Sequence, residues 1–487
     1  MKIVQNYIGG KFVDSAGHLE DVVNPATAEV IAQVPYTTQE EVEGAVGVAN
    51  KAFLDWRRVP PTERVVYLFK LEHLLGEQKN FDRIARSIVE EEGKTLAEAR
   101  GEVTRTIENV RDASSVVHQL GYNMEIARGI EDRVVRRPRG VFAMLAPFNF
   151  PAMVPWWIVP YGIATGNTQI LKPSERAPIT QSIIFELVDQ LGLPPGVINL
   201  VNGDFTVSNY LLESEGIVGA SSVGSSKGAE AIYKRGTSYG KKVLALGGAK
   251  NFTTVMADAN LEKAVNNIIG SCYGCAGERC LSADVVLVAE SVYEQFIGMF
   301  VEAARKLKLG YGLNEGVDIG PVITAKSRER ILGMIGRALG DGATLALDRR
   351  FEVVKGYEKG YFIGPIVLEG VRPGMEIAQE EIFGPVACLM KMADGEVGLR
   401  EAISITNSSR YGNAASIFTE SGYYAKIFES EIKPGMVGIN IAVVAPVAPF
   451  PFGGTAFSLF GDLKTQGWQI VDFFTEHQTI VSRYFGR

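Results

Sequence analysis

Residues 141–151 read Val-Phe-Ala-Met-Leu-Ala-Pro-Phe-Asn-Phe-Pro, an apolar strand that ends in a loop held between two prolines. The chain then repeats this plan. A second strand at 168–171 runs into Lys-Pro-Ser-Glu, an amphipathic helix spans 179–191, and a third strand covers 197–201. Strands that alternate with helices predict a parallel, doubly wound α/β sheet, which binds its ligands at the carboxyl ends of its strands.

At 487 residues the chain is too long for a single hydrophobic core. Two further regions flank the strand–helix series described above. On the amino side, the alternating segment 6–13 predicts a hairpin, and helical spacing of apolar residues from Thr38 to about Ser115 predicts several helices. On the carboxyl side, a second strand–helix series starts near Val243. We expect its helix at 260–271 and its strands at 252–256, 284–288, 387–392, 415–418 and 437–441.

A charged, alternating segment at 121–139 interrupts these patterns. It predicts a projecting hairpin that pairs with the equally alternating tail at 479–484. Exposed strand edges need to be covered, so we expect a homodimer or homotetramer.

Composition excludes several classes of function. A net charge of −7 offers no basic surface to nucleic acid or anionic lipid. The most apolar stretch, 153–164, is broken by Pro155 and Pro160 and is shorter than the roughly 20 residues of a membrane-spanning helix. The first thirty residues lack a secretory pattern, and four cysteines do not make a disulfide framework. We expect a soluble, cytoplasmic protein.

The stretch 277–280, Gly-Glu-Arg-Cys, contains the strongest candidate nucleophile. Cys280 follows a helix and a glycine-bearing loop, which favours access, and the adjacent Arg279 favours the thiolate. A single free cysteine is more often a small buried hydrophobic residue, which is what we expect of Cys272 and Cys388.

The same region has a spacing that could suggest a metal site. Cys272, Cys275 and Cys280 form a C-x2-C-x4-C run, but no histidine lies nearby to complete a ligand set. We therefore expect no metal.

Five other stretches carry chemistry. Asn149, fixed between two prolines after a strand, is suited to donate to an oxyanion, although an isolated asparagine there would indicate only a turn. Residues 172–175 place a lysine and a glutamate at the end of a strand, and 224–228, Gly-Ser-Ser-Lys-Gly, opens a helix as phosphate-binding loops do. The remaining stretches are Leu-Gly-Gly-Ala-Lys-Asn at 246–251 and Glu-Glu-Ile-Phe-Gly-Pro at 380–385.

In this order, and over essentially the whole chain, these stretches resemble the aldehyde dehydrogenase superfamily. The resemblance implies a Rossmann-like NAD-binding domain at 1–118 and 138–246 and a second α/β catalytic domain at 247–441. It also implies a small β oligomerisation segment at 119–137 and 466–487.

The resemblance also implies a role for each motif. Cys280 attacks the aldehyde, the Asn149 amide and the backbone N–H of Cys280 hold the oxyanion, and hydride transfer to NAD leaves a thioester. A carboxylate at Glu175 repels a 2′-phosphate and so favours NAD over NADP. The residues implied to bind the cofactor are Phe148, Lys172, Glu175, Gly224, Ser225, Gly247, Glu381 and Phe383.

One departure from the general pattern concerns the acyl acceptor. Most hydrolytic members carry a glutamate before Leu-Gly-Gly, whereas this chain has Ala245 and no carboxylate within four residues on either side. General-base catalysis is worth roughly 10²- to 10⁴-fold, and a thiol needs less help than water does. The absence is typical of methylmalonate-semialdehyde dehydrogenases, which acylate coenzyme A. That branch implicates Arg105 and Arg279 in handling the substrate or coenzyme A; the less favoured alternative for Arg105 is a solvated helix residue.

Other positions depart from that branch, which usually has phenylalanine at Ser222, glycine at Ala229 and histidine at Phe252. The segment 450–457 also differs from its common forms. Two alternatives therefore stay open: a dehydrogenase that releases a free acid from another aldehyde, and a catalytically silent binding protein of the same fold.

Overall fold

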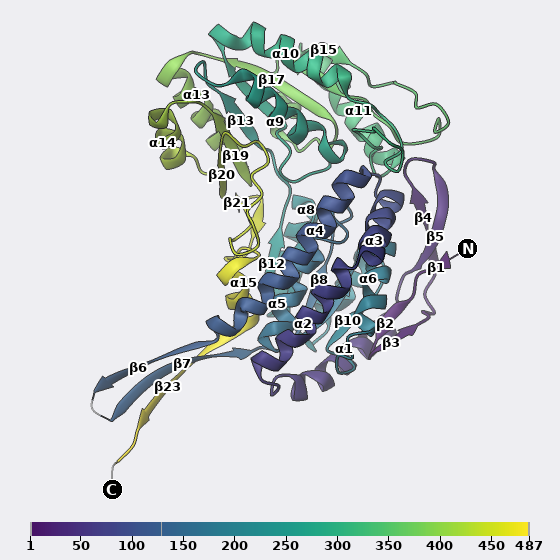
Figure 1. Ribbon diagram of the computed structural model, residues 1–487, viewed down its shortest axis with the longest axis vertical. Helices are drawn as coiled ribbons and strands as arrows, with labels where there is room; N and C mark the ends of the chain where they lie inside the picture. Colours follow the sequence, from purple (N-terminus) through teal and green to yellow (C-terminus); the bar gives the residue numbers. More distant parts are fainter. Residues whose placement is uncertain (1, 128, 486–487) are drawn as a thin grey trace.

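The computed structural model describes residues 2–127 and 129–485. Two large sheets form two lobes, one above the other in Figure 1, and a narrow third sheet projects from the lower lobe. The predicted architecture, two α/β units with a small β segment, is confirmed. The predicted domain limits stay a prediction.

The first sheet has eight strands in the order β22-β12-β11-β8-β9-β10-β2-β3. Side chains of its central strand alternate between two cores: Val141 and Ala143 pack on one face, and Phe142 and Met144 on the other. The sequence predicts that the strand near Val243 opens the second series, but this strand pairs in parallel with β11 and belongs to the first sheet. The parallel strands are β8 (Val141–Leu145), β9 (Thr168–Lys172), β10 (Ile198–Leu200), β11 (Ile217–Val223) and β12 (Lys242–Leu246), and the antiparallel ones are β2 (Asn6–Ile8), β3 (Lys11–Val13) and β22 (Leu459–Phe460).

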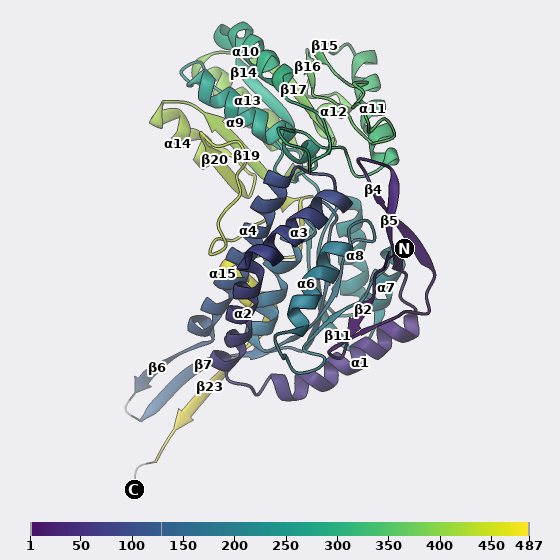
Figure 2. The same cartoon turned by 45° about the vertical axis from the view of Figure 1, so that its right-hand side comes forward.

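Helices cover both faces of this sheet (Figure 2). Two of them start at capping boxes, Thr38 with Glu41 and Thr95 with Glu98, in which each side chain satisfies a backbone N–H of the first turn. One face carries α1 (Gln39–Trp56), α7 (Phe205–Glu213) and α8 (Ser226–Ser238); the other carries α2 (Pro61–Gly76), α3 (Gln78–Glu91), α4 (Leu96–Ala113), α5 (Val159–Thr165) and α6 (Ile179–Asp189).

The second sheet has the order β15-β16-β17-β14-β13-β19-β20, and its predicted strands are confirmed. It starts at β13, directly after the Leu-Gly-Gly stretch that ends the first sheet. Its strands are β13 (Phe252–Val255), β14 (Val285–Ala289), β15 (Thr344–Asp348), β16 (Ile366–Glu369), β17 (Val386–Met392), β19 (Ala414–Phe418) and β20 (Met436–Ile439), of which β15 alone is antiparallel. Its helices are α9 (Leu261–Tyr273), α10 (Tyr293–Lys306), α11 (Ala325–Gly340), α13 (Gly395–Ser408) and α14 (Gly422–Glu431).

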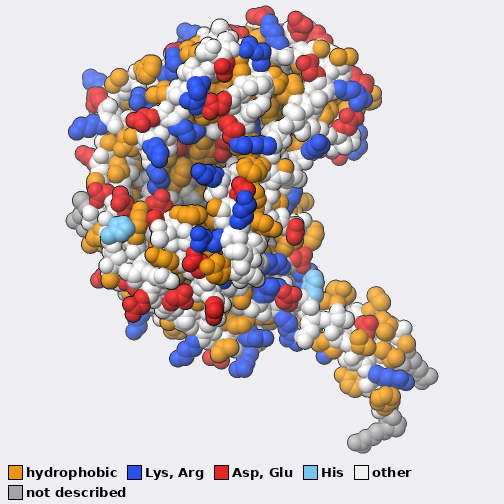
Figure 3. All heavy atoms as spheres, turned by 180° about the vertical axis from the view of Figure 1, so that it is seen from behind, with side chains coloured by type: hydrophobic (Ala, Val, Ile, Leu, Met, Phe, Trp, Pro, Cys, Tyr) orange, Lys and Arg blue, Asp and Glu red, His pale blue; other side chains and the backbone are white. Residues whose placement is uncertain are grey.

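The projecting sheet consists of β6 (Gly121–Ala127), β7 (Ile130–Pro138) and β23 (Thr475–Arg483). The carboxyl-terminal strand β23 pairs with β7 along its whole length, which confirms the predicted hairpin and its partner. Hydrophobic side chains cover this projection in Figure 3, among them Tyr122 and Met124, which are mainly exposed.

The shorter elements lie outside the two large sheets and the projecting sheet. They are β1 (Lys2–Ile3), β4 (Leu19–Asn24), β5 (Glu29–Pro35), α12 (Glu376–Gln379), β18 (Tyr411–Gly412), β21 (Thr455–Ala456) and α15 (Gly467–Phe474). Within the described residues, every helix is too short or too polar to cross a membrane.

Candidate active site

A cavity of about 860 Å³ lies where the parallel strands of the first sheet end. Its walls come from the loops after β8, β9, β11 and β12 and from the stretch 380–383 of the second lobe. This volume falls in the range of roughly 300–1,000 Å³ that holds small ligands and cofactors. The structure brings together here all ten residues predicted for nucleophile, oxyanion donor and cofactor: Phe148, Asn149, Lys172, Glu175, Gly224, Ser225, Gly247, Cys280, Glu381 and Phe383.

A second cavity, of about 320 Å³, lies on the other side of the candidate nucleophile. It contains the two predicted substrate arginines, Arg105 and Arg279. Cys280, Phe150 and Trp157 line both cavities. Cys280 therefore stands at the junction between a large cofactor-sized space and a smaller, arginine-bearing one.

The loop that carries Cys280 is held in an unusual backbone conformation. Three successive residues after α9 have positive φ: Cys275 at 50°, Ala276 at 51° and Gly277 at 74°. At Gly277 a Cβ would lie 2.1 Å from the carbonyl oxygen of Gly384, so only glycine fits against the stretch 380–385. Left-handed non-glycine residues are costly and concentrate at functional sites.

The peptide of the nucleophile is fixed from the second lobe. The carbonyl oxygen of Cys280 accepts hydrogen bonds from the side-chain amides of Asn251, at 3.0 Å, and Asn413, at 2.7 Å. Sequence reasoning missed both contacts, because Asn413 lies 133 residues further along the chain.

The Cys280 thiol is neutral at pH 7 in the free protein. Burial raises the pKa of Cys280 to about 12, and the carboxylate of Glu381 adds to that increase. Arg279 lowers this pKa, which is the predicted direction, but by less than burial raises it. The guanidinium is directed elsewhere: it lies 3.3 Å from the carboxylate of Glu98 and donates to the sulfur of Cys275 at 3.2 Å.

Asn149 is buried in the loop after β8. Its side-chain nitrogen donates to the carbonyl oxygen of Glu278 at 2.9 Å, and its backbone oxygen accepts from the ammonium of Lys94 at 2.7 Å. An amide nitrogen carries two N–H groups, so one remains for an oxyanion formed at Cys280.

The predicted cofactor residues fit a dinucleotide. Ser225 caps α8 by accepting from the N–H of Gly228 at 3.2 Å, which places a helix N-terminus on the cavity, where phosphates bind. The ammonium of Lys172 donates to the backbone oxygens of Pro173 and Gly203, which leaves one of its three N–H groups for a ligand, and Glu175 lines the same cavity.

Glu381 reaches the same cavity from the second lobe. Its carboxylate accepts the N–H of Ala249 at 3.0 Å, and burial raises its pKa to about 8. A Cβ at Gly248 would lie 2.4 Å from the Glu381 carboxylate, so the glycine allows this carboxylate to approach the backbone closely.

Position 245 offers no base to either cavity. Ala245 is fully buried in β12 and lines neither space. The described carboxylates that line the larger cavity are Glu175, Glu230, Glu380 and Glu381; those of the smaller one are Glu98 and Glu102. Among residues 2–127 and 129–485, no group of three or more metal-binding side chains is placed to hold an ion.

A buried ion pair between Lys94 and Glu102 was also not predicted from the sequence. The signal was present: Glu102 falls on the buried stripe of α4 formed by Ala99, Val103 and Thr106, where a charge needs a partner.

Known proteins are similar to this chain over nearly its whole length. The aldehyde dehydrogenase family model matches residues 12–480. Malonate-semialdehyde dehydrogenase 2 of Bacillus cereus is 45% identical over 487 residues, which cover 99% of this chain and 98% of that protein.

Two solved structures superimpose on the whole chain. Methylmalonate-semialdehyde dehydrogenase from Oceanimonas doudoroffii gives a TM-score of 0.97 at 38% identity and covers 100% of this chain and 99% of its own. An enzyme assigned as a methylmalonate-semialdehyde dehydrogenase from Sinorhizobium meliloti 1021, solved in complex with NAD, gives 0.96 at 36% identity with the same coverage. The chain belongs to the aldehyde dehydrogenase family.

Proposed function

We propose that this protein oxidises malonate or methylmalonate semialdehyde with NAD and transfers the acyl group to coenzyme A. The observation that carries this proposal is the position of Cys280 between the two cavities. The larger cavity is suited to the dinucleotide, and the smaller one places Arg105 and Arg279 where a carboxylate tail would extend from an aldehyde bound at Cys280.

The chain's own residues account for the first half of the reaction. The Cys280 thiol releases its proton to solvent, and its sulfur forms a bond to the aldehyde carbon, whose oxygen becomes an oxyanion. The Asn149 amide and the Cys280 backbone N–H donate to that oxyanion. A bound nicotinamide supplies the acceptor for the hydride that leaves this carbon, and the carbonyl then re-forms as a thioester on Cys280.

The missing base at Ala245 supports a thiol as acyl acceptor. Attack by the coenzyme A thiolate on the thioester carbon expels the Cys280 thiolate and needs no carboxylate to activate water. The names of the similar proteins from Bacillus cereus and Oceanimonas doudoroffii support the same substrate class.

We also propose an oligomer and a cytoplasmic location. The hydrophobic side chains of the projecting sheet support the first, and four free cysteines support a reducing compartment.

NADH formation from malonate semialdehyde, with and without coenzyme A, tests the proposal. We expect multiple turnovers only with coenzyme A and a single burst of NADH without it. Steady turnover without coenzyme A would instead select the acid-releasing alternative. A complete lack of NADH, including the burst, would select the silent binding protein.

A further inference from the structure

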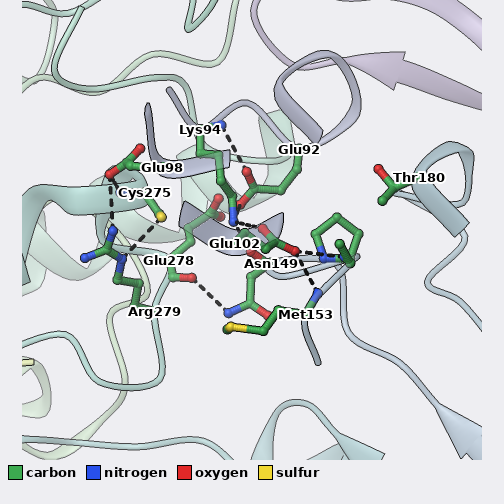
Figure 4. A network of polar contacts seen from close by, with 12 residues as sticks. Glu92, Lys94, Glu98, Glu102, Asn149, Met153, Thr180, Cys275, Glu278 and Arg279 are labelled. Carbon is green, nitrogen blue, oxygen red and sulfur yellow. Dashed lines mark hydrogen bonds and ion pairs between the residues drawn. The ribbon is translucent and has the colours of Figure 1, made fainter. Parts of the chain in front are cut away.

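The loop that carries Asn149 rests on a buried ion pair. Lys94 lies in the connection between α3 and α4, and Glu102 lies in α4. The ammonium of Lys94 is 2.7 Å from a Glu102 carboxylate oxygen, and both side chains are fully buried. Figure 4 shows this pair at the centre of a polar network beside Asn149.

The two members of the pair hold opposite ends of the segment 149–153. Lys94 donates to the backbone oxygen of Asn149 at 2.7 Å, and its ammonium lies 3.8 Å from the ring centre of Phe150. The second oxygen of Glu102 accepts the N–H groups of Ala152, at 2.8 Å, and Met153, at 3.1 Å. The pair therefore acts as a clamp on the loop.

Lys94 keeps its charge in the folded protein. Burial by itself would lower the pKa of Lys94, but Glu102 and Glu92 raise it above its usual range. Burial also raises the pKa of Glu92 to about 8, so Glu92 is mostly protonated at pH 7. A buried ion pair is weak evidence for stability, because an apolar pair of similar volume often does as well. The contacts of the Lys94–Glu102 pair with the loop 149–153 indicate a role in positioning that loop.

We propose that Lys94 and Glu102 are positioning residues that set the side-chain amide of Asn149 for the oxyanion at Cys280; this inference rests on the proposed function. Neither residue needs to touch the substrate for this. Lys94 fixes the backbone of Asn149, and the carbonyl oxygen of Glu278 accepts one N–H of the Asn149 side-chain amide. The second N–H of that amide is thereby directed toward the oxyanion.

A double-mutant cycle tests whether the pair acts through Asn149. Lys94→Met and Asn149→Ala are measured singly and together for the rate of the first NADH burst with malonate semialdehyde. Loss of an oxyanion donor lowers such rates by roughly 10²- to 10³-fold, so we expect Lys94→Met to cost roughly 10- to 100-fold alone. In the Asn149→Ala background the same substitution should cost almost nothing further.

Two controls separate positioning from general damage. Lys241→Met removes another buried ammonium, which donates to the carbonyls of Ser214 and Ile217 away from both cavities, and should leave the burst rate unchanged. Iodoacetamide alkylation of Cys280, which needs no oxyanion donor, should proceed at the wild-type rate in Lys94→Met. Glu102→Gln keeps an oxygen for the two N–H groups of the loop and should lose less than Glu102→Ala.

Equal losses from Lys94→Met in the two backgrounds would overturn the proposal, as would slowed alkylation of Cys280. Failure of the proposed function gives a different result, because wild-type protein would then either turn over steadily without coenzyme A or produce no NADH burst at all.

Discussion

The side-chain amide of Asn149 donates a hydrogen bond to the carbonyl oxygen of Glu278 at 2.9 Å. Asn149 follows β8 of the first lobe, and Glu278 precedes Cys280 by two residues in a loop attached to the second. One contact therefore joins the loop of the oxyanion donor to the loop of the nucleophile across the junction of the lobes. The same amide has two tasks, to hold the nucleophile loop and to receive the developing charge.

Both tasks predict the effect of changing Asn149. Asn149→Ala should lower the acylation rate by roughly 10²- to 10³-fold, because one oxyanion donor is lost. Asn149→Asp should lower it more, since a carboxylate would face both the Glu278 carbonyl and the oxyanion. Rapid-quench or stopped-flow measurement of the NADH burst checks this order. An aspartate variant faster than the alanine variant would show that no negative charge develops near Asn149.

The pH dependence of Cys280 reactivity follows from its neighbours. Because its pKa is raised to about 12, the thiolate fraction and the alkylation rate should rise roughly tenfold per pH unit below pH 7 and by less between pH 7 and 9, where Glu381 becomes charged. Glu381, whose pKa is raised to about 8, is mostly neutral below pH 8 and charged above it. Glu381→Gln should therefore accelerate alkylation at pH 9 and change it little at pH 6.5. Equal acceleration at both values would contradict the assigned electrostatics.

Local sequence patterns were sufficient to predict most of the fold and to predict that the cofactor motifs lie together in one cavity. The alternation of 141–151 and the helical spacing of 179–191 each depend on neighbours in sequence, and the carboxyl ends of parallel strands necessarily meet at one edge. The motifs that end those strands, at 172–175 and 224–228, were therefore expected in one place.

Contacts between distant segments could not be predicted in this way. From the sequence, the strand near Val243 could end the first sheet or begin the second. Its pairing with β11 shows that it belongs to the first sheet. Arg279 is adjacent to Cys280 in sequence, yet burial of the thiol outweighs its charge, and its guanidinium pairs with Glu98 of α4. Burial and pairing are properties of the assembled fold.

We predict that cofactor preference depends on Glu175, whose neighbour Arg176 lies 3.6 Å away and lines the same cavity. Glu175→Ser should raise the use of NADP relative to NAD by roughly tenfold or more, because it removes a repulsive charge and frees a cation for the 2′-phosphate. The ratio of kcat/KM values for the two cofactors measures the change. The double variant Glu175→Ser/Arg176→Ala should lose most of the gain; an equal gain in both would show that Arg176 takes no part.

Thermal stability should depend on Glu92. Its pKa is raised to about 8 in the folded protein, mainly by burial, whereas the unfolded chain has the ordinary value near 4.5. Folding favours the protonated form of Glu92, so the contribution of Glu92 to stability is complete below pH 4.5 and is lost as the pH rises through 8. Glu92→Gln mimics the protonated form, so its Tm should fall less than the wild-type Tm between pH 5 and 8.5. Glu40→Gln, on the exposed first turn of α1, is the control and should follow the wild-type curve.

Arg105 is the residue on which substrate preference should depend. It lines the smaller cavity beside Cys280, and its guanidinium is paired with Glu108 at 2.8 Å, one turn along α4. Both side chains of that pair are about 40% exposed, and partly exposed pairs of this kind contribute little to stability. A substrate carboxylate can therefore replace Glu108 at small cost, and a guanidinium binds it through two hydrogen bonds.

Arg105→Ala should accordingly lower kcat/KM for malonate semialdehyde by roughly ten- to a hundred-fold, since a hydrogen bond to a charged group is worth about 1.5–3 kcal/mol. Propanal, which has the same reacting carbon and no carboxylate, should be oxidised about as well as by the wild type. Arg100→Ala is the matched control, because Arg100 lies on the same helix, pairs with Asp82 at 3.0 Å and lines neither cavity. If kcat/KM for propanal fell as much as kcat/KM for the semialdehyde, Arg105 would stabilise the helix rather than bind the carboxylate. If Arg100→Ala reproduced the loss, the effect would come from the charge of α4 as a whole.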